Sequence, residues 1–247
     1  MAWKDLFSAQ APDYARFRPT YPAALFAWLA AVSPARRLAL DVGAGSGQAA
    51  RDLAESFDRV IALDPSRAQL ASGELHVRVM PVVGSASALP VAAAAVDLIV
   101  SAQAFHWFDQ RGFFAEIRRA GGPGAVLAVW CYGLSRVTAE VDAAVAELYE
   151  GHLGPYWEPE RRLIEGGYRN VAFPFSPLDV PDFAMTSEWT FAQFIGYLST
   201  WSPRKKYRAA TGRDALEVMA PALAAAWGPE DQPRTVTWPL SVRAFRI

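Results

Sequence analysis

Residues 38–48 read LALDVGAGSGQ, a short apolar run followed by three glycines at alternate positions. The run from Leu38 to Val42 is bounded by this turn signal, which predicts a buried strand. The residues from Gln48 to Phe57 are rich in Ala and Leu and favour a helix. Glycines let the backbone turn sharply between the two and let a ligand approach with no Cβ in the way. The stretch therefore predicts a strand, a tight turn and a helix.

The alternation of strand and helix continues along the chain. Short apolar runs predict further strands at residues 60–63, 77–83, 96–100 and 125–130. Helices are expected over Gln110–Ala120 and from Ser66, a residue type that caps helices, to about Ser72. Apolar strands separated by helices form a parallel sheet with both faces covered. Ligands bind such sheets at the carboxyl ends of the strands.

The pattern changes after residue 131. Residues 137–149 predict a helix, but residues 151–181 are rich in Pro, Gly and aromatics and show no clear period. We interpret residues 132–181 as an insertion or cap within a single domain that spans residues 1–247.

The last part of the chain predicts two helices and two strands. The helices are expected at residues 191–198 and 214–227, and the strands at 183–189 and 235–247. Pro239 should lie at a bulge or a sheet edge, because proline has no N–H for the ladder. The predicted fold is α/β: a doubly wound, mostly parallel sheet of seven strands with helices on both faces and an inserted cap.

Composition limits the class of protein. Hydrophobic residues make up 52% of the chain, enough to build a core. The 24 Lys and Arg residues nearly balance the 25 Asp and Glu residues, and the net charge is -1. The cluster of Arg204, Lys205, Lys206 and Arg208 is interpreted as a solvated surface. With no basic stripe for phosphates, nucleic acid is a poor candidate partner.

The compartment follows from cysteine usage and hydropathy. Cys131 is the only cysteine, which excludes an intrachain disulfide and argues against a cysteine-built metal site, so no metal is expected. The segment Met1–Asp5 lacks the basic and apolar regions of a secretion signal. No apolar stretch reaches the roughly 20 residues needed to cross a bilayer. We expect a cytoplasmic protein without membrane attachment; the sequence does not indicate an oligomeric state.

The glycine turn carries the first functional signal. Its spacing is G-x-G-x-G rather than the G-x-G-x-x-G of dinucleotide-binding turns. Asp41 precedes the first glycine by two residues, where a carboxylate can face a cationic group such as an ammonium. Asp64 ends the second strand about 20 residues beyond the turn, a position suited to bonding ribose hydroxyls. The alternative for Asp64 is a structural role at the start of the helix that Ser66 caps.

Together with other stretches, these residues resemble the class I S-adenosylmethionine-dependent methyltransferases, which have a Rossmann-like fold. Within that family the chain resembles the small-molecule branch that includes trans-aconitate methyltransferases. The stretches that carry the resemblance are residues 14–22 (YARFRPTYP), 41–48 (DVGAGSGQ), 64–66 (DPS), 89–90 (LP), 96–98 (VDL), 103–109 (QAFHWFD) and 122–124 (GPG).

The resemblance implies which residues bind S-adenosylmethionine. Gly43, Gly45 and Gly47 would line its methionine moiety, Asp64 would hold the ribose, Ser85 and Ala86 would flank the adenine, and Gln103 would lie under the sulfonium. Tyr14 and Arg18 would belong to a segment that closes over the cofactor, with Arg18 on its carboxylate, and Gln48 and Pro65 would also contact it. One departure is Ser85, because the family often has an acidic residue there. An alternative is that the N-terminal segment only packs on the sheet edge.

The methyl acceptor is expected beside His106, the one histidine near the predicted site. With an ordinary pKa near 6.5, His106 is a candidate general base, although packing beside Trp107 is the favoured interpretation. Candidate acceptor-binding residues are Tyr21, His106, Trp107, Tyr132 and Trp157.

Other side chains near the expected acceptor site are more ambiguous. Phe108 and Tyr156 are further candidates for its wall, and Trp130 is assigned to the core because aromatics are more often core than ligand cage. For Arg161 and Arg162 a surface position is favoured over binding of an acidic acceptor.

The sequence thus predicts methyl transfer from S-adenosylmethionine to a small molecule, with a carboxylate or a hydroxyl as candidate acceptor groups. Two alternatives stay open: a non-catalytic S-adenosylmethionine-binding protein and a nicotinamide-dependent oxidoreductase. The latter lacks both its usual glycine spacing and a Tyr-x-x-x-Lys pair after the fifth strand.

Overall fold

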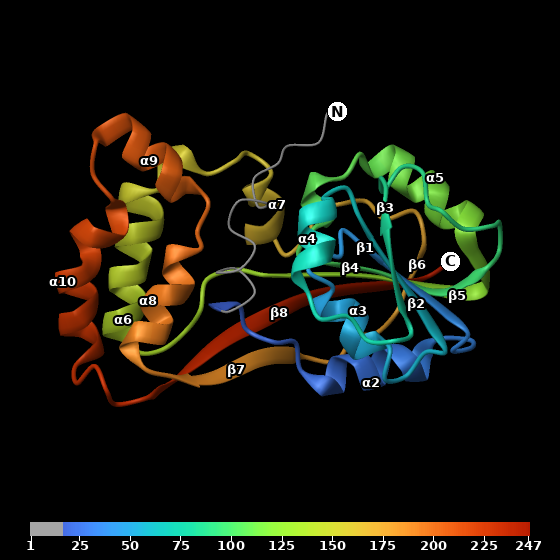
Figure 1. Cartoon of the computed structure of the whole chain (residues 1–247), viewed down its shortest axis with the longest axis horizontal. Helices are drawn as coiled ribbons and strands as arrows, with labels where there is room; N and C mark the ends of the chain where they lie inside the picture. Colours follow the sequence, from blue (N-terminus) through green and yellow to red (C-terminus); the bar gives the residue numbers. More distant parts are fainter. Residues whose placement is uncertain (1–16) are drawn as a thin grey trace.

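The computed structural model describes residues 17–247, which form a sheet of eight strands in the order β3-β2-β1-β4-β5-β8-β6, with β7 paired to β8 (Figure 1). The strands are β1 Leu38–Val42, β2 Arg59–Asp64, β3 Val79–Val83, β4 Val96–Ala102, β5 Gly121–Tyr132, β6 Ser176–Pro177, β7 Phe183–Trp189 and β8 Arg234–Arg246. Strands β1 to β5 pair in parallel, and β6, β7 and β5 pair antiparallel with β8. The seven predicted strands are present, and the two-residue β6 is an addition.

Helices cover both faces of the sheet. The helices within residues 17–247 are α2 Ala23–Val32, α3 Gln48–Leu53, α4 Arg67–Ser72, α5 Gln110–Ala120, α6 Ala139–Ala146, α7 Arg161–Glu165, α8 Phe191–Ser199, α9 Pro203–Thr211 and α10 Ala215–Trp227. Short turns of 3₁₀ helix occur at Phe105–Trp107 and Gly154–Tyr156, and a π-helical turn at Glu147–His152. None of the helices in the described part of the chain is both long and apolar enough to cross a membrane.

Alternation along the parallel strands builds two hydrophobic cores. In β1, Ala39 packs with α2 and α3 on one face, whereas Leu40 and Val42 pack with α5 on the other. Because successive side chains of a strand point to opposite faces, each apolar strand contributes to both cores. The doubly wound, mostly parallel α/β fold predicted from the sequence is confirmed, and the Rossmann-like arrangement of the first half with it.

A third core lies away from the parallel strands. Helices α6, α8 and α10 pack there with the outer parts of β7 and β8, where Met185, Val236 and Trp238 are buried. In Figure 1 these helices and α9 form a group beside the sheet, joined to it by the long strands β7 and β8. We call α6, α8, α9, α10 and the turns at 147–156 the helical layer.

The predicted cap, residues 132–181, is divided between two parts of the structure. Residues 139–156 belong to the helical layer, which α8, α9 and α10 complete from beyond residue 181. Residues in and after α7 pack back on the sheet, since Ile164, Tyr168 and Val171 belong to the core under α5.

Strand β8 changes partners along its length. It pairs with β7 from Arg234 to Leu240 and with β5 from Leu240 to Arg246. Pro239 lies just before the pairing with β5 begins, at a position where a missing N–H costs no bond to that strand.

The cluster interpreted as a solvated surface forms a helix, α9, with specific contacts. Arg204 pairs with Asp214, the residue that caps α10, and its side chain is only 20% exposed. Lys206 pairs with Glu158 of the loop before α7. The surface interpretation of this cluster is therefore wrong for Arg204, whereas Lys205, Lys206 and Arg208 are exposed as expected, and Lys206 also ties α9 to that loop.

Candidate functional site

A cavity of about 730 Å³ opens at the carboxyl ends of the parallel strands. Its walls come from the turns after β1, β2 and β3, the segment after β4, the end of β5, the loop before α7, α7 itself and α8. Parallel α/β sheets bind ligands at this edge, so the cavity lies where the sequence places the site.

The three glycines of the turn play different roles. Gly43, Gly45 and Gly47 all have positive φ, at 74°, 58° and 79°, which only glycine adopts readily. A Cβ on Gly43 would lie 2.5 Å from the Cβ of Ala104, and one on Gly47 would lie 2.3 Å from Leu75. At Gly45 it would meet nothing closer than Gln69, at 3.9 Å. Gly43 and Gly45 line the cavity, whereas Gly47 is needed for packing against Leu75.

Asp64 connects the glycine turn to the start of α4. One carboxylate oxygen accepts a hydrogen bond from the N–H of Gly45 at 2.8 Å, and the other accepts one from Ser66 at 2.7 Å. Burial raises the pKa of Asp64, while these two donors oppose the rise. The carboxylate lines the cavity, and each oxygen keeps a lone pair for a ligand. Ser66, not Asp64, caps α4 by accepting the N–H of Gln69.

Asp41 is fully buried at the end of β1 and does not line the cavity. Neither of its carboxylate oxygens has a hydrogen-bond partner of ordinary geometry among residues 17–247. Burial, and then the neighbouring charge of Asp64, raise the pKa of Asp41 to about 7, with the N–H of Ala50 opposing. An orphaned buried carboxylate is costly unless a proton or a cation neutralises it.

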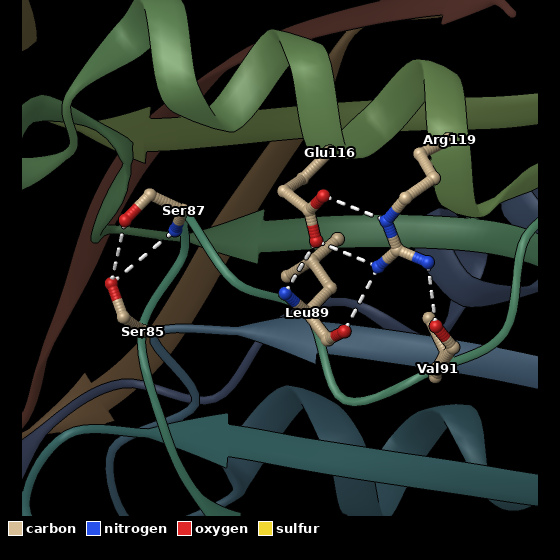
Figure 2. A network of polar contacts seen from close by, with 6 residues as sticks. All are labelled: Ser85, Ser87, Leu89, Val91, Glu116 and Arg119. Carbon is tan, nitrogen blue, oxygen red and sulfur yellow. Dashed lines mark hydrogen bonds and ion pairs between the residues drawn. The ribbon is translucent and has the colours of Figure 1, made fainter.

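The loop after β3 is held in place from α5. Figure 2 shows the guanidinium of Arg119 between the carboxylate of Glu116 and the carbonyls of Leu89 and Val91. Glu116 also accepts the N–H of Leu89 at 2.7 Å, and the Arg119 guanidinium holds the pKa of Glu116 below its usual range. This network fixes the loop whose first residues line the cavity, including Ser85.

Ser85 and Ala86 line the cavity at the start of that loop. The Ser85 hydroxyl lies 3.0 Å from the Ser87 hydroxyl and accepts the N–H of Ser87 at 3.3 Å (Figure 2). The pair of hydroxyls occupies the place where an acidic residue is common in the family that the sequence resembles.

The side chain of Gln103 is committed to the backbone of Tyr132. Its amide donates to the Tyr132 carbonyl at 3.1 Å and accepts the Tyr132 N–H at 2.9 Å, with Gln103 at a φ of 55°. Arg18 donates to the Tyr132 hydroxyl at 3.0 Å and lies over the ring of Tyr197. The amide of Gln48 bonds the carbonyl of Pro19. Gln103, Arg18 and Gln48 thus shape the cavity wall through protein contacts.

His106 is 6% exposed and lines the cavity. Its Nδ1 lies 3.1 Å from the Tyr168 hydroxyl, and its Nε2 has no hydrogen-bond partner among the described residues. Burial, reinforced by the charge of Arg161, lowers the pKa of His106 to about 3. The imidazole is therefore neutral at physiological pH and a weak base. In residues 17–247 no group of three or more His, Cys, Asp and Glu side chains is placed to hold a metal ion.

Aromatic side chains form the end of the cavity beyond His106. The candidate acceptor-binding residues Tyr21, Trp107, Tyr132 and Trp157 line it, together with Phe108. The other two candidates for the wall lie elsewhere. Trp130 is fully buried in the core, as predicted, and Tyr156 packs edge-on against Tyr207.

Arg161 also lines the cavity, so the favoured surface interpretation is wrong for this residue. Arg162 is exposed, as predicted. The structure adds lining residues that the sequence analysis does not identify: Ser46, Gln69, Ser87, Asp109, Glu158, Glu160, Ile164, Tyr197, Trp201 and Ser202. Tyr14 lies outside the described residues, and Pro65, a candidate cofactor contact, lines the cavity.

Comparison with known proteins identifies the family. Residues 40–129 match the family described as "Methyltransferase domain". A methyltransferase of Dictyostelium discoideum, provisionally named, is 33% identical over 216 residues, which cover 86% of this chain and 82% of that protein. An uncharacterised methyltransferase of Mycobacterium bovis is 33% identical over 126 residues, about half of either protein.

Solved structures agree with the sequence relatives. A provisionally named type II methyltransferase from Anaeromyxobacter dehalogenans has 50% identity and a TM-score of 0.87, covering 93% of this chain and 98% of that one. These matches favour a methyltransferase over the two alternatives that the sequence leaves open, a non-catalytic binding protein and an oxidoreductase. On these grounds the chain belongs to the class I S-adenosylmethionine-dependent methyltransferases.

Proposed function

We propose that the protein transfers a methyl group from S-adenosylmethionine to a small-molecule acceptor, with a carboxylate or a hydroxyl as the methylated group. The observation that carries the proposal is one cavity that joins the glycine turn and Asp64 to His106 and Trp107. Its volume of about 730 Å³ falls within the roughly 300–1,000 Å³ of small-molecule sites. Cofactor and acceptor would therefore share one enclosed space.

The residues at the strand ends fit S-adenosylmethionine. Gly45 leaves open space where a side chain would otherwise stand, and Asp64 keeps acceptor sites for ribose hydroxyls. The carboxylate of Asp41 lies behind the cavity lining, so it would act on a cationic group such as the cofactor ammonium through its charge rather than by contact. Ser85 and Ala86 would flank the adenine, and Arg18, whose guanidinium donates to the Tyr132 hydroxyl at the cavity wall, would face the cofactor carboxylate.

When bound, S-adenosylmethionine supplies a methyl carbon made electrophilic by its sulfonium. The chain binds and orients the reactants within the aromatic end of the cavity, and positioning alone accounts for a large part of such rate enhancements. His106 faces this space as a neutral imidazole, whose low pKa suits orientation of the acceptor better than removal of a proton.

Within the family we assign the chain to the small-molecule branch that resembles trans-aconitate methyltransferases. Support comes from two stretches that the sequence shares with that branch. Arg18 and Tyr21 of the first and Gln103, His106 and Trp107 of the second line the same cavity.

The compartment and partners are part of the proposal. A cytoplasmic location is consistent with Cys131, a buried thiol whose pKa burial raises to about 12. The proposed partner is a small-molecule acceptor rather than nucleic acid or a membrane. Cell fractionation and electrophoretic mobility assays would test these points.

Methyl transfer from labelled S-adenosylmethionine across a panel of small carboxylic acids, phenols and amines tests the function. Mass analysis should find a product heavier by one methyl group, formed together with S-adenosylhomocysteine. Calorimetry should show that the protein binds S-adenosylhomocysteine. Absence of this binding would contradict the cofactor site, and binding without methylation of any acceptor would contradict the acceptor site.

A further inference from the structure

The acceptor end of the cavity contains a cation that no part of the proposed cofactor site uses. Arg161 opens α7, which lies between the helical layer and the sheet (Figure 1). Its half-buried side chain lines the cavity with His106, Trp157 and Ile164. A charged side chain in a largely aromatic pocket requires either a compensating partner or a ligand.

Three contacts hold the Arg161 guanidinium in one orientation. Its Nε donates to the Tyr149 hydroxyl at 2.9 Å, and that hydroxyl donates to Glu165 at 2.6 Å. The guanidinium also lies over the rings of Trp157 at 4.7 Å and Tyr149 at 5.4 Å. Planar guanidinium groups stacked on aromatics in this way lose little entropy when they bind a ligand.

The rest of the guanidinium has no protein partner. Among residues 17–247, the two terminal nitrogens of Arg161 form no hydrogen bond and no ion pair. These nitrogens form the fork that binds a carboxylate with two parallel hydrogen bonds. Arg161 and His106 line the same cavity, so these nitrogens belong to the part of the molecule where the acceptor is proposed to bind.

The carboxylates near Arg161 form no direct ion pair with it among residues 17–247. Glu165 accepts from Tyr149 rather than from Arg161 itself. Glu158, at the cavity wall, pairs with Lys206 of α9, and Glu160 lies beside it on the same wall without an ion pair to Arg161. The two terminal nitrogens of Arg161, a residue that lines the cavity, are therefore left for a ligand there.

We propose that Arg161 is the docking point for an anionic group of the acceptor, so that the substrate is an organic acid with an apolar or aromatic body. The inference rests on the proposed function, because it names the chemical class of the acceptor at that same site. Trp107, Trp157 and Tyr132 surround the apolar body, and Arg161 selects acids over neutral molecules of the same shape.

Matched acids and primary amides test the selection. The probes are phenylacetate, cinnamate and hexanoate, each compared with its amide by calorimetry on the intact protein saturated with S-adenosylhomocysteine. Charge-assisted hydrogen bonds in such a setting are worth about 10- to 100-fold in affinity. The wild type should therefore bind the acids at least about 10-fold more tightly than the amides.

Variants at neighbouring arginines assign the preference to one residue. Arg161→Gln should abolish the acid preference, and Arg161→Lys should retain part of it because the charge remains without the fork. Arg162→Gln is the control, since Arg162 is the adjacent, exposed arginine outside the cavity and should behave as wild type. Circular dichroism and the affinity for S-adenosylhomocysteine should be unchanged in all three variants.

Three results would overturn the proposal: equal affinity for acid and amide, a preference that survives in Arg161→Gln, or no acid binding at millimolar concentration. Each leaves binding of S-adenosylhomocysteine intact. Failure of the proposed function would instead remove that binding or show no methyl transfer to any acceptor, so the two failures are distinguishable.

Discussion

The substitution Asp64→Asn separates the binding role of this residue from its structural role. The carboxylate accepts one backbone N–H on each oxygen, from Gly45 and from Ser66. Asparagine keeps the shape but replaces one oxygen with an amino group. One of the two backbone donors then faces another donor, and the negative charge at the cavity is lost.

The magnitude follows from these contacts. A buried donor left without its acceptor costs about 1–3 kcal/mol. For a chain of about 250 residues each kcal/mol lowers Tm by roughly 2–4 °C, so the apparent Tm should fall by about 2–12 °C. If the remaining acceptor sites of Asp64 bind the ribose, hydrogen bonds to a charged group worth about 1.5–3 kcal/mol are weakened as well. The Kd for S-adenosylhomocysteine should therefore rise by about 10- to 100-fold.

Calorimetry and thermal unfolding measure the two effects, and Asp97→Asn provides the matched control. Asp97 is also buried and also accepts backbone N–H groups, from Arg37 and Leu38, in addition to an ion pair with the Arg37 side chain, but it is the second residue of β4 and does not line the cavity. Asp97→Asn should lower Tm without changing Kd. If Asp64→Asn also lowered Tm and left Kd within about twofold of wild type, the ribose-binding role would be refuted.

Four further predictions concern the turn, the buried acids and bases, and the loop after β3. Gly45→Val should abolish calorimetric binding of S-adenosylhomocysteine, because the side chain fills open cavity space and strains the turn at the positive φ of Gly45; circular dichroism checks that the overall fold is kept, and unchanged affinity would contradict the cofactor assignment. Since the pKa of Asp41 is raised in the fold to about 7, the folded state loses stability as pH rises from about 4 to 7. In urea unfolding, the free energy of unfolding of Asp41→Asn should therefore rise relative to that of wild type over that pH interval, by on the order of 4 kcal/mol. A difference between the two proteins that does not change with pH would refute the raised pKa of Asp41. With the pKa of His106 at about 3, single-turnover rates should show no His106-dependent rise near pH 6.5, and a rise there that His106→Gln removes would establish a general base. Arg119→Ala should raise the Kd for S-adenosylhomocysteine about 2- to 10-fold by loosening the loop that carries Ser85, measured by calorimetry; a fall in Tm alone would make the network purely structural.

The elements that the sequence predicts well have a strong local signal. Gln110–Ala120 and Phe183–Trp189 have the predicted bounds, since one has a clear helical period and the other alternates. The residues after Leu53 were expected to continue a helix, but they turn toward β2 instead. Helix α9 has almost no buried apolar face, so periodicity does not reveal it. Its boundaries come from Pro203 at the first position and Gly212 at the C-cap.

The site shows the same division. The glycine turn and Asp64 stand at predictable positions because local motifs fix the strand ends. Arg161 takes its place from tertiary packing: Tyr149 of a π-helical turn and Trp157 of a loop orient it. Tyr197 reaches the cavity from α8, which packs there only because β7 and β8 carry the helical layer. No local pattern contains such information, so these residues could not be found from the sequence.

The long strand β8 has a mechanical consequence for how substrates enter. One uninterrupted backbone ladder runs from the core shared with β5 to the core shared with β7. A hinge-like rotation of the helical layer away from the sheet would break that ladder. Twisting of the two-stranded β7–β8 ribbon would keep it, because two-stranded ribbons accommodate large twists. We therefore expect any relative movement of the helical layer and the sheet, and with it ligand exchange, to occur by torsion of the β7–β8 ribbon. Stiffening the β7–β8 ribbon would be expected to slow product escape while leaving the chemistry at the strand ends untouched.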